Sequence, residues 1–359
     1  MIRNDFALDY TQSGLLISAF SLSYGFGHLP AGWLADHIGY RAMITLGISG
    51  VALAGLFIGL SQTYIMAIIF MVVMGLAGGG YHPASTPVIS ASVEPQNRGR
   101  ALGIHVMGGS ASYFLSPLVA AAIAVAWGWR GSFITLAIPT LIFGIIIFML
   151  LGRQATREKI KQRATATTTE APPPGHWRRL TVFIVLSTVT QAFIFATITF
   201  IPLFLVDHFR IGEEAAAALL ALIYSAGFWA GPLGGYLSDR LGKIPVILAV
   251  CFIVGPAIYL LSLLPYGWGI IALLVIIGMV VYVRMPVSEA YIISHTSERN
   301  RSTILGIYYF TGVEGSGVLA PVIGHLSDQF GFNTSFTIVG AAIFGVTLVC
   351  SILLWGKRD

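Results

Sequence analysis

Six polar side chains lie within long apolar stretches of this chain, where such groups normally have a partner or a task. They are Tyr81, His82, Gln191, Arg284, Glu289 and Glu314. An arginine keeps its positive charge on burial, so Arg284 is a candidate for recognising an anion. A carboxyl group in an apolar place is driven toward its protonated form. Glu289 and Glu314 are therefore candidates for binding and releasing a proton.

Four of these side chains also have a simpler structural interpretation. At 1.5 Å per residue, Arg284 lies about 14 Å and Glu314 about 16 Å from the same end of their apolar runs, so the two could form an ion pair. Glu289 could instead pair with Arg299 or Arg301, which follow it in the chain. A buried histidine such as His82 is more often hydrogen-bonded within a core than engaged with a ligand.

The sequence offers no sign of an enzyme. It has no arrangement of nucleophile and base, no cluster of ligands at metal spacing and no phosphate-binding loop. The glycine-rich run 75–80 follows no strand, and the two cysteines, Cys251 and Cys350, lie inside apolar runs as small core residues. We therefore expect no catalytic activity, no cofactor, no metal site and no ATP-driven motor.

The elements that must position these side chains are membrane helices. Of the 359 residues, 56% are apolar and only 10% are charged, whereas about a quarter of a soluble domain is charged. Apolar runs long enough to cross a bilayer are expected to be helices, because the lipid tolerates no unpaired backbone. Eleven such runs can be traced, near 12–35, 43–60, 65–90, 101–126, 132–151, 180–206, 214–237, 245–264, 268–293, 303–325 and 334–355.

A polar, basic stretch over 153–179 divides five runs from six. We predict an amino-terminal bundle over 1–152, a linker over 153–179 and a carboxy-terminal bundle over 180–359. Sixteen of the 20 lysines and arginines fall in loops on one side, which places the linker and the carboxyl terminus in the cytoplasm of a cell-membrane protein. The basic charge is thus a signal of topology and does not point to nucleic acid.

The two bundles are predicted to be copies of one another in parallel orientation. Gly32, Asp36 and Gly39 recur 203 residues later as Gly235, Asp239 and Gly242, and Arg98 and Gly128 recur as Arg301 and Gly331. In this register the run 180–206 would have its counterpart ahead of Met1. We therefore expect the first of twelve helices to be missing here, through a mis-assigned start or a truncated form.

The repeated loops carry a second kind of chemistry. Residues 32–41 read Gly-Trp-Leu-Ala-Asp-His-Ile-Gly-Tyr-Arg, and residues 235–243 read Gly-Tyr-Leu-Ser-Asp-Arg-Leu-Gly-Lys. Asp36 can accept hydrogen bonds from the exposed amides of a neighbouring helix start while pairing with a cation such as Arg41 or Arg100. The simpler interpretation is a tight polar turn with ordinary cytoplasmic charges.

These loops resemble the signature loop of the major facilitator superfamily, Gly-x-Leu-x-Asp-x-x-Gly-Arg-Arg/Lys, and a shorter echo follows at 324–331. With the repeat and the linker, the resemblance covers essentially the whole chain. It implies that fold: two pseudo-symmetric helical bundles around a site halfway through the membrane. It also implies a cytoplasmic latch that favours the outward-open state, formed by Gly32, Asp36, Gly39, Arg41, Arg100, Gly235, Asp239, Arg240, Gly242 and Lys243.

In that family the first, fourth, seventh and tenth spans line the cavity, so the resemblance implies that Tyr81, His82, Gln191 and Arg284 face it together. Residues 80–83, with Gly108 and Gly109, are also similar to the fosmidomycin-resistance type of efflux protein. We expect secondary active transport of a small organic solute by a monomer, as proton-coupled efflux. The alternatives are proton-coupled uptake of an anionic metabolite, and a membrane scaffold or sensor that transports nothing.

Overall fold

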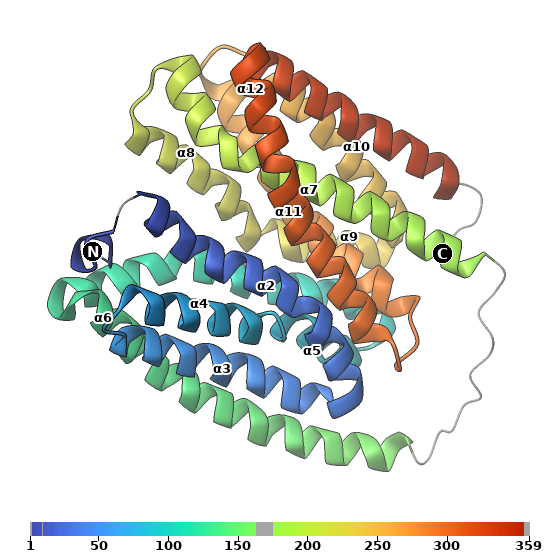
Figure 1. Cartoon of the computed structure of the whole chain (residues 1–359). Helices are drawn as coiled ribbons and strands as arrows, with labels where there is room; N and C mark the ends of the chain where they lie inside the picture. Colours follow the sequence, from blue (N-terminus) through green and yellow to red (C-terminus); the bar gives the residue numbers. More distant parts are fainter. Residues whose placement is uncertain (1, 9, 163–174, 355–359) are drawn as a thin grey trace. The chain divides into compact units, whose positions relative to one another are not determined.

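The computed structural model describes residues 2–8, 10–162 and 175–354 (Figure 1). Every regular element in these ranges is a helix, so the predicted all-α fold is confirmed. Residues 163–174 of the predicted linker lie outside the described ranges, whereas residues 153–162 continue a helix. Each of the eleven predicted apolar runs coincides with helical segments.

The first repeat contains one short helix, a set of long helices and a 3-10 turn. Glycines 78–80 interrupt the predicted run 65–90, which is therefore two helices, and both α2 and α3 pack against the first of them, α4 (Figure 1). The elements are α1 (Ile2–Asp5), α2 (Tyr10–Ile38), α3 (Tyr40–Leu60), α4 (Tyr64–Gly78), α5 (Tyr81–Ala91), η1 (Pro95–Asn97) and α6 (Arg98–Gln162).

The second repeat has its break on a different helix. The counterpart of α2 is bent by 41° between α8 and α9, whereas α11 is continuous and packs against α8, α9 and α10. The elements are α7 (His176–Phe209), α8 (Glu213–Ser225), η2 (Ala226–Phe228), α9 (Ala230–Leu241), α10 (Lys243–Leu261), α11 (Trp268–Ser294) and α12 (Arg301–Leu354).

The internal repeat extends to the backbone angles of single glycines. Gly39 and Gly242 have φ of 93° and 89°, and Gly128 and Gly331 have φ of 68° and 78°. Residues with side chains rarely adopt such angles. The second pair marks the sharp turns at which α6 and α12 are each divided into two helices.

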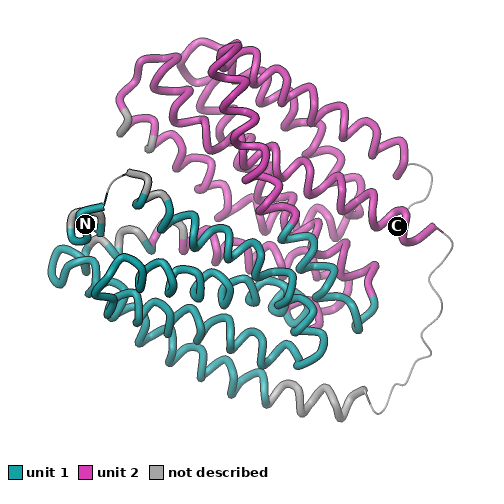
Figure 2. Tube along the Cα trace, viewed as in Figure 1, with its two compact units in different colours: residues 1–88, 116–174, 297–310 teal, residues 89–115, 175–296, 311–359 magenta. Residues whose placement is uncertain are grey.

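The described helices are those of a multi-pass membrane protein. By length and apolarity seven helical segments among the described residues could cross a membrane, with α4 and α5 counted as one, or eight if α8 and α9 form one bent span. The chain packs as two compact units, residues 1–88, 116–174 and 297–310, and residues 89–115, 175–296 and 311–359 (Figure 2). Each unit consists mainly of one repeat and takes in a helix start from the other.

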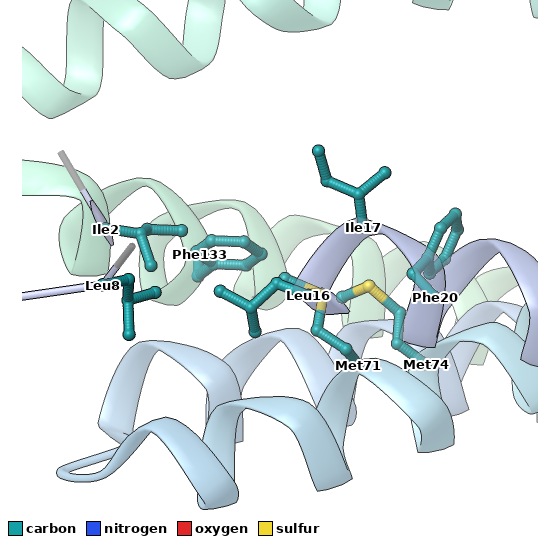
Figure 3. Close-up of a pocket in the computed structure, with 8 residues that line it drawn as sticks. All are labelled: Ile2, Leu8, Leu16, Ile17, Phe20, Met71, Met74 and Phe133. Carbon is teal, nitrogen blue, oxygen red and sulfur yellow. The ribbon is translucent and has the colours of Figure 1, made fainter. Parts of the chain in front are cut away.

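The first unit contains an apolar pocket of about 380 Å³ between side chains of α2, α4 and α6 (Figure 3). Phe133 lines it and is half-buried. The repeat counterpart of Phe133 is Phe336, which is fully buried because Phe204 of α7 packs on its ring at 5.0 Å. The pocket thus adjoins the counterpart of a residue that α7 covers in the second repeat, and its lining contains none of the predicted site residues.

Candidate functional site

Arg284 is held inside the second unit by two neighbouring helices. It lies in the most buried stretch of α11 and is only 2% exposed. Its Nη1 atom donates to the carbonyl oxygen of Ser187 on α7 at 3.1 Å and to the hydroxyl oxygen of the same serine at 2.9 Å. That hydroxyl is also 2.6 Å from the hydroxyl of Ser288, one turn along α11. The cation is thereby fixed between α7 and α11.

The oxygen atoms that receive Nη1 are neutral. Among the described residues no ion pair joins Arg284 to Glu314, which is half-buried on α12, so the predicted structural role of this pair is absent. Hydrogen bonds between two charged groups are stronger than those to a neutral oxygen, and a guanidinium can hold a carboxylate through two parallel bonds. If an anion reached Nη1, the Arg284 guanidinium would therefore exchange a neutral acceptor for a charged one.

Gln191 lies one helical turn beyond Ser187 on α7, and residues four apart share a helix face. Its carboxamide packs against Gly312 of α12, where an added Cβ would come within 2.8 Å of the Gln191 Cδ atom. The Gln191 Oε1 atom is buried and accepts no hydrogen bond. The face of α7 that holds Arg284 therefore also presents a buried acceptor to any donor that enters.

The two predicted proton-binding carboxyl groups have different surroundings. Glu289 follows Arg284 by five residues on α11 and is fully buried, whereas Glu314 on α12 is only half-buried. A fully buried carboxyl group is costly to ionise without compensation. The proton-coupling role of both residues stays a prediction.

Tyr81 and His82 begin α5 in the first unit. The two rings lie 5.3 Å apart, and the His82 ring lies 5.5 Å from that of Tyr309 on α12. The Tyr309 hydroxyl is 3.0 Å from the hydroxyl of Thr86, one turn along α5 from His82. Tyr309 and Thr86 were not predicted from the sequence, although Thr86 is the repeat counterpart of Glu289.

The predicted cavity residues are divided between the two units. Tyr81 and His82 belong to the first unit, and Gln191 and Arg284 belong to the second. Within the second unit, Arg284 contacts Ser187, which lies one turn before Gln191 on α7. That all four face one cavity stays a prediction.

The predicted contact between Asp36 and a helix start is present in the first unit. The backbone amides of Ser302 and Thr303, at the start of α12, donate to the Asp36 carboxylate at 3.0 and 2.8 Å. The Thr303 hydroxyl donates to it at 2.7 Å. The first amides of a helix have no acceptor within it, and a negative charge is favourable there. Asp36 thus caps a helix of the other repeat.

The second copy of this contact lies in the second unit. The Asp239 carboxylate accepts from the backbone amides of Gly99 and Arg100, at the start of α6, at 3.0 and 2.9 Å. Gly235 allows this approach, because an added Cβ would come within 2.0 Å of the Gly99 carbonyl oxygen. Each repeat therefore caps the corresponding helix of the other.

The side chains of the predicted latch arginines have other contacts than the predicted pairing of Arg41 or Arg100 with Asp36. Arg41 donates from Nε to the carbonyl oxygen of Phe148 at 2.8 Å and lies over that ring. Arg100 meets Asp239 through its backbone, and Arg240 lies over the Tyr236 ring at 4.6 Å. The Asp36 and Asp239 carboxylates accept hydrogen bonds from backbone amides, and the guanidinium groups of Arg41 and Arg240 lie over aromatic rings instead. A latch role for the ten residues stays a prediction.

These features match a known family. The family model described as Major Facilitator Superfamily matches residues 1–313. The chain belongs to the Major Facilitator Superfamily. As a member of this superfamily it is a transporter and not an enzyme, it spans the membrane several times, and the class of function it supports is secondary transport of a small solute.

Named superfamily relatives cover almost the whole chain. The hexuronate transporter of Bacillus subtilis (strain 168) is 24% identical over 366 residues, covering 96% of this chain and 86% of that protein. The cis,cis-muconate transport protein of Acinetobacter baylyi is 23% identical over 363 residues, covering 98% and 86%. The human organic anion transporter MFSD10 has a TM-score of 0.76 at 18% identity, covering 95% of this chain and 83% of that structure, which shows a shared fold.

Proposed function

We propose that this protein transports a small organic anion by alternating access and that protons drive the transport. The observation that carries the proposal is Arg284, a cation 2% exposed whose Nη1 atom is held by neutral oxygens. A substrate carboxylate would receive the guanidinium. The named relatives that carry a hexuronate and cis,cis-muconate, both organic acids, support the same class.

Gln191 narrows the class of substrate. Its buried Oε1 atom accepts no hydrogen bond and lies one turn from the serine that holds Arg284. A buried acceptor without a donor is costly, and a substrate hydroxyl that donates to it would remove this cost. We therefore propose a hydroxy acid, with its carboxylate at Arg284 and a hydroxyl at Gln191.

Proton coupling is proposed for Glu289 and Glu314. Glu289 is fully buried on the helix that carries Arg284. Ionisable groups inside membrane spans commonly form proton pathways. We further propose that the protein is a monomer in the cell membrane. The uneven distribution of lysine and arginine supports a cytoplasmic position for its linker and carboxyl terminus.

The test is transport into proteoliposomes that contain the purified protein. D-glucuronate and D-glucose share a ring and differ in one carboxylate, so they form a matched pair of probes. We expect flux of glucuronate and not of glucose, with a rate that changes when a pH gradient is imposed. Equal rates for both probes, or no flux of either, would overturn the anion proposal.

The direction of coupling is read from the same vesicles. Export, as predicted from sequence, requires preloaded glucuronate to leave faster when protons move inward. Uptake requires glucuronate to accumulate when the outside is acidic. A proton ionophore should abolish either effect, and persistence of accumulation in its presence would contradict proton coupling.

A further inference from the structure

The crossing of α2 with the start of α12, which we define as residues 28–36 and 301–310, contains a buried histidine. All of these residues lie in the first unit (Figure 2). His28 is 1% exposed, and its Nδ1 atom is 3.3 Å from the carbonyl oxygen of Gly25, which accepts from it. The His28 ring lies 4.7 Å from that of Tyr24 and 5.5 Å from that of Tyr309.

The two helices touch through their backbones at this crossing. A Cβ added to Gly306 would come within 2.4 Å of the His28 carbonyl oxygen, and one added to Gly32 within 2.5 Å of the Ser302 carbonyl oxygen. His28 is buried, so the closed crossing excludes water from the imidazole on this side. Hydration of His28 from this side requires α2 and α12 to separate.

The repeat counterpart of this crossing does not require a histidine. It joins α9 to the start of α6, where Gly231 stands at the position of His28 and Val106 at that of Tyr309. The approach is equally close, because a Cβ added to Gly103 would come within 2.3 Å of the Gly231 carbonyl oxygen. The histidine is thus an addition to a crossing that packs without one.

The titratable groups around His28 are aromatic. Tyr24 faces the His28 ring from α2, and Tyr309 faces it from α12. The element α4 contributes only backbone here: a Cβ added to Gly79 would come within 2.9 Å of the backbone nitrogen of His28. On α5, the His82 ring lies 5.5 Å from that of Tyr309. The attraction of two aromatic rings for a protonated imidazole is much weaker than the cost of burying that charge away from water. The protonated imidazole therefore favours a hydrated, separated crossing.

We propose that His28 is a proton-binding site and that its protonation opens the α2–α12 crossing. This goes beyond the proposed transport of an anion, because it places a coupling proton in the first unit on a residue other than the predicted carboxyl groups. Because the closed crossing binds only the neutral imidazole, protonation of His28 shifts the equilibrium toward the state in which α2 and α12 are separated.

The test is hydrogen exchange of the segment 301–310 at several pH values, on the full-length protein in lipid nanodiscs without substrate, with rates divided by those of the unstructured peptide. A water-exposed histidine is half-protonated near pH 6.5. Between pH 7.5 and 5.5 the protection of this segment should therefore fall about tenfold in the wild-type protein. In His28→Gln it should stay constant.

A matched control and a second variant make the result specific. His37 lies on the same helix and is exposed, so His37→Gln should retain the wild-type pH dependence. His28→Gly introduces the residue of the repeat counterpart and should also be insensitive to pH. Protection that is independent of pH in the wild-type protein, or a fall that survives in both His28 variants, would overturn the proposal. Neither outcome depends on whether an anion is transported.

Discussion

Replacing Asp36 with asparagine should loosen the start of α12 without touching the corresponding contact of the other repeat. One carboxylate oxygen accepts from the amide of Ser302, and the other accepts from the amide and the hydroxyl of Thr303. Asparagine retains one acceptor oxygen and directs an NH₂ group at a donor. One charge-assisted hydrogen bond is lost and two become neutral.

The magnitude follows from these three contacts. A hydrogen bond to a charged group contributes about 1.5–3 kcal/mol and a neutral one about 1 kcal/mol, so the sum approaches 4 kcal/mol. Asp36 is partly exposed, and solvent screening reduces the effect to about 2 kcal/mol. Exchange of the amides of Ser302 and Thr303 should then accelerate about thirtyfold.

The assay is hydrogen exchange read at single residues, with Asp239→Asn as the matched variant. Asp239→Asn should accelerate exchange at Gly99 and Arg100, which donate to that carboxylate, and should leave the start of α12 unchanged. Unchanged exchange at the start of α12 in Asp36→Asn would refute the role of this carboxylate as a cap.

Two further predictions concern the first unit. Gly32→Ala should lower the thermal midpoint of unfolding, because the new Cβ would lie 2.5 Å from the Ser302 carbonyl oxygen. Gly345→Ala is the control and should leave the midpoint nearly unchanged, because an added Cβ there meets nothing within 4 Å. Equal midpoints for the two variants would contradict the close approach at Gly32. The hydrogen bond from Arg130 lowers the pKa of Asp5, so their contact should stabilise the protein above the ordinary carboxyl pKa of about 3.9 and be lost as pH falls through the lowered value. Arg130→Gln should raise the pKa of Asp5 in a carbon-13 titration, and an unchanged titration would contradict this.

The repeat could be predicted from sequence because its markers are glycines and aspartates with strict geometric tasks. Gly39 and Gly242 occupy positive φ, and Asp36 and Asp239 both cap helix starts, as their common offset indicates. Breaks inside the apolar runs were not predictable. Glycines 78–80 divide α4 from α5, whereas their counterparts at 281–283 are not glycines, and Gly227 in η2 has Tyr24 as its counterpart. The repeat therefore does not carry a break from one half to the other.

The candidate site was predictable only as far as single residues. Arg284 was singled out by its charge in an apolar run, but its contact with Ser187 joins residues 97 apart in sequence. The contact of Tyr309 with Thr86 joins residues 223 apart. No spacing rule reveals such partners, since they depend on which helices pack together. His28 was not among the predicted site residues, because it lies closer to the cytoplasmic end of its apolar run.

The most direct test of anion transport compares two arginines in the glucuronate assay. Arg284→Gln and Arg178→Gln remove the same charge from a buried and an exposed position. Loss of a charged hydrogen bond should lower the influx of D-glucuronate tenfold to about a hundredfold in Arg284→Gln, while Arg178→Gln stays near the wild-type rate. Equal influx in both variants, with each protein folded, would contradict a substrate role for Arg284.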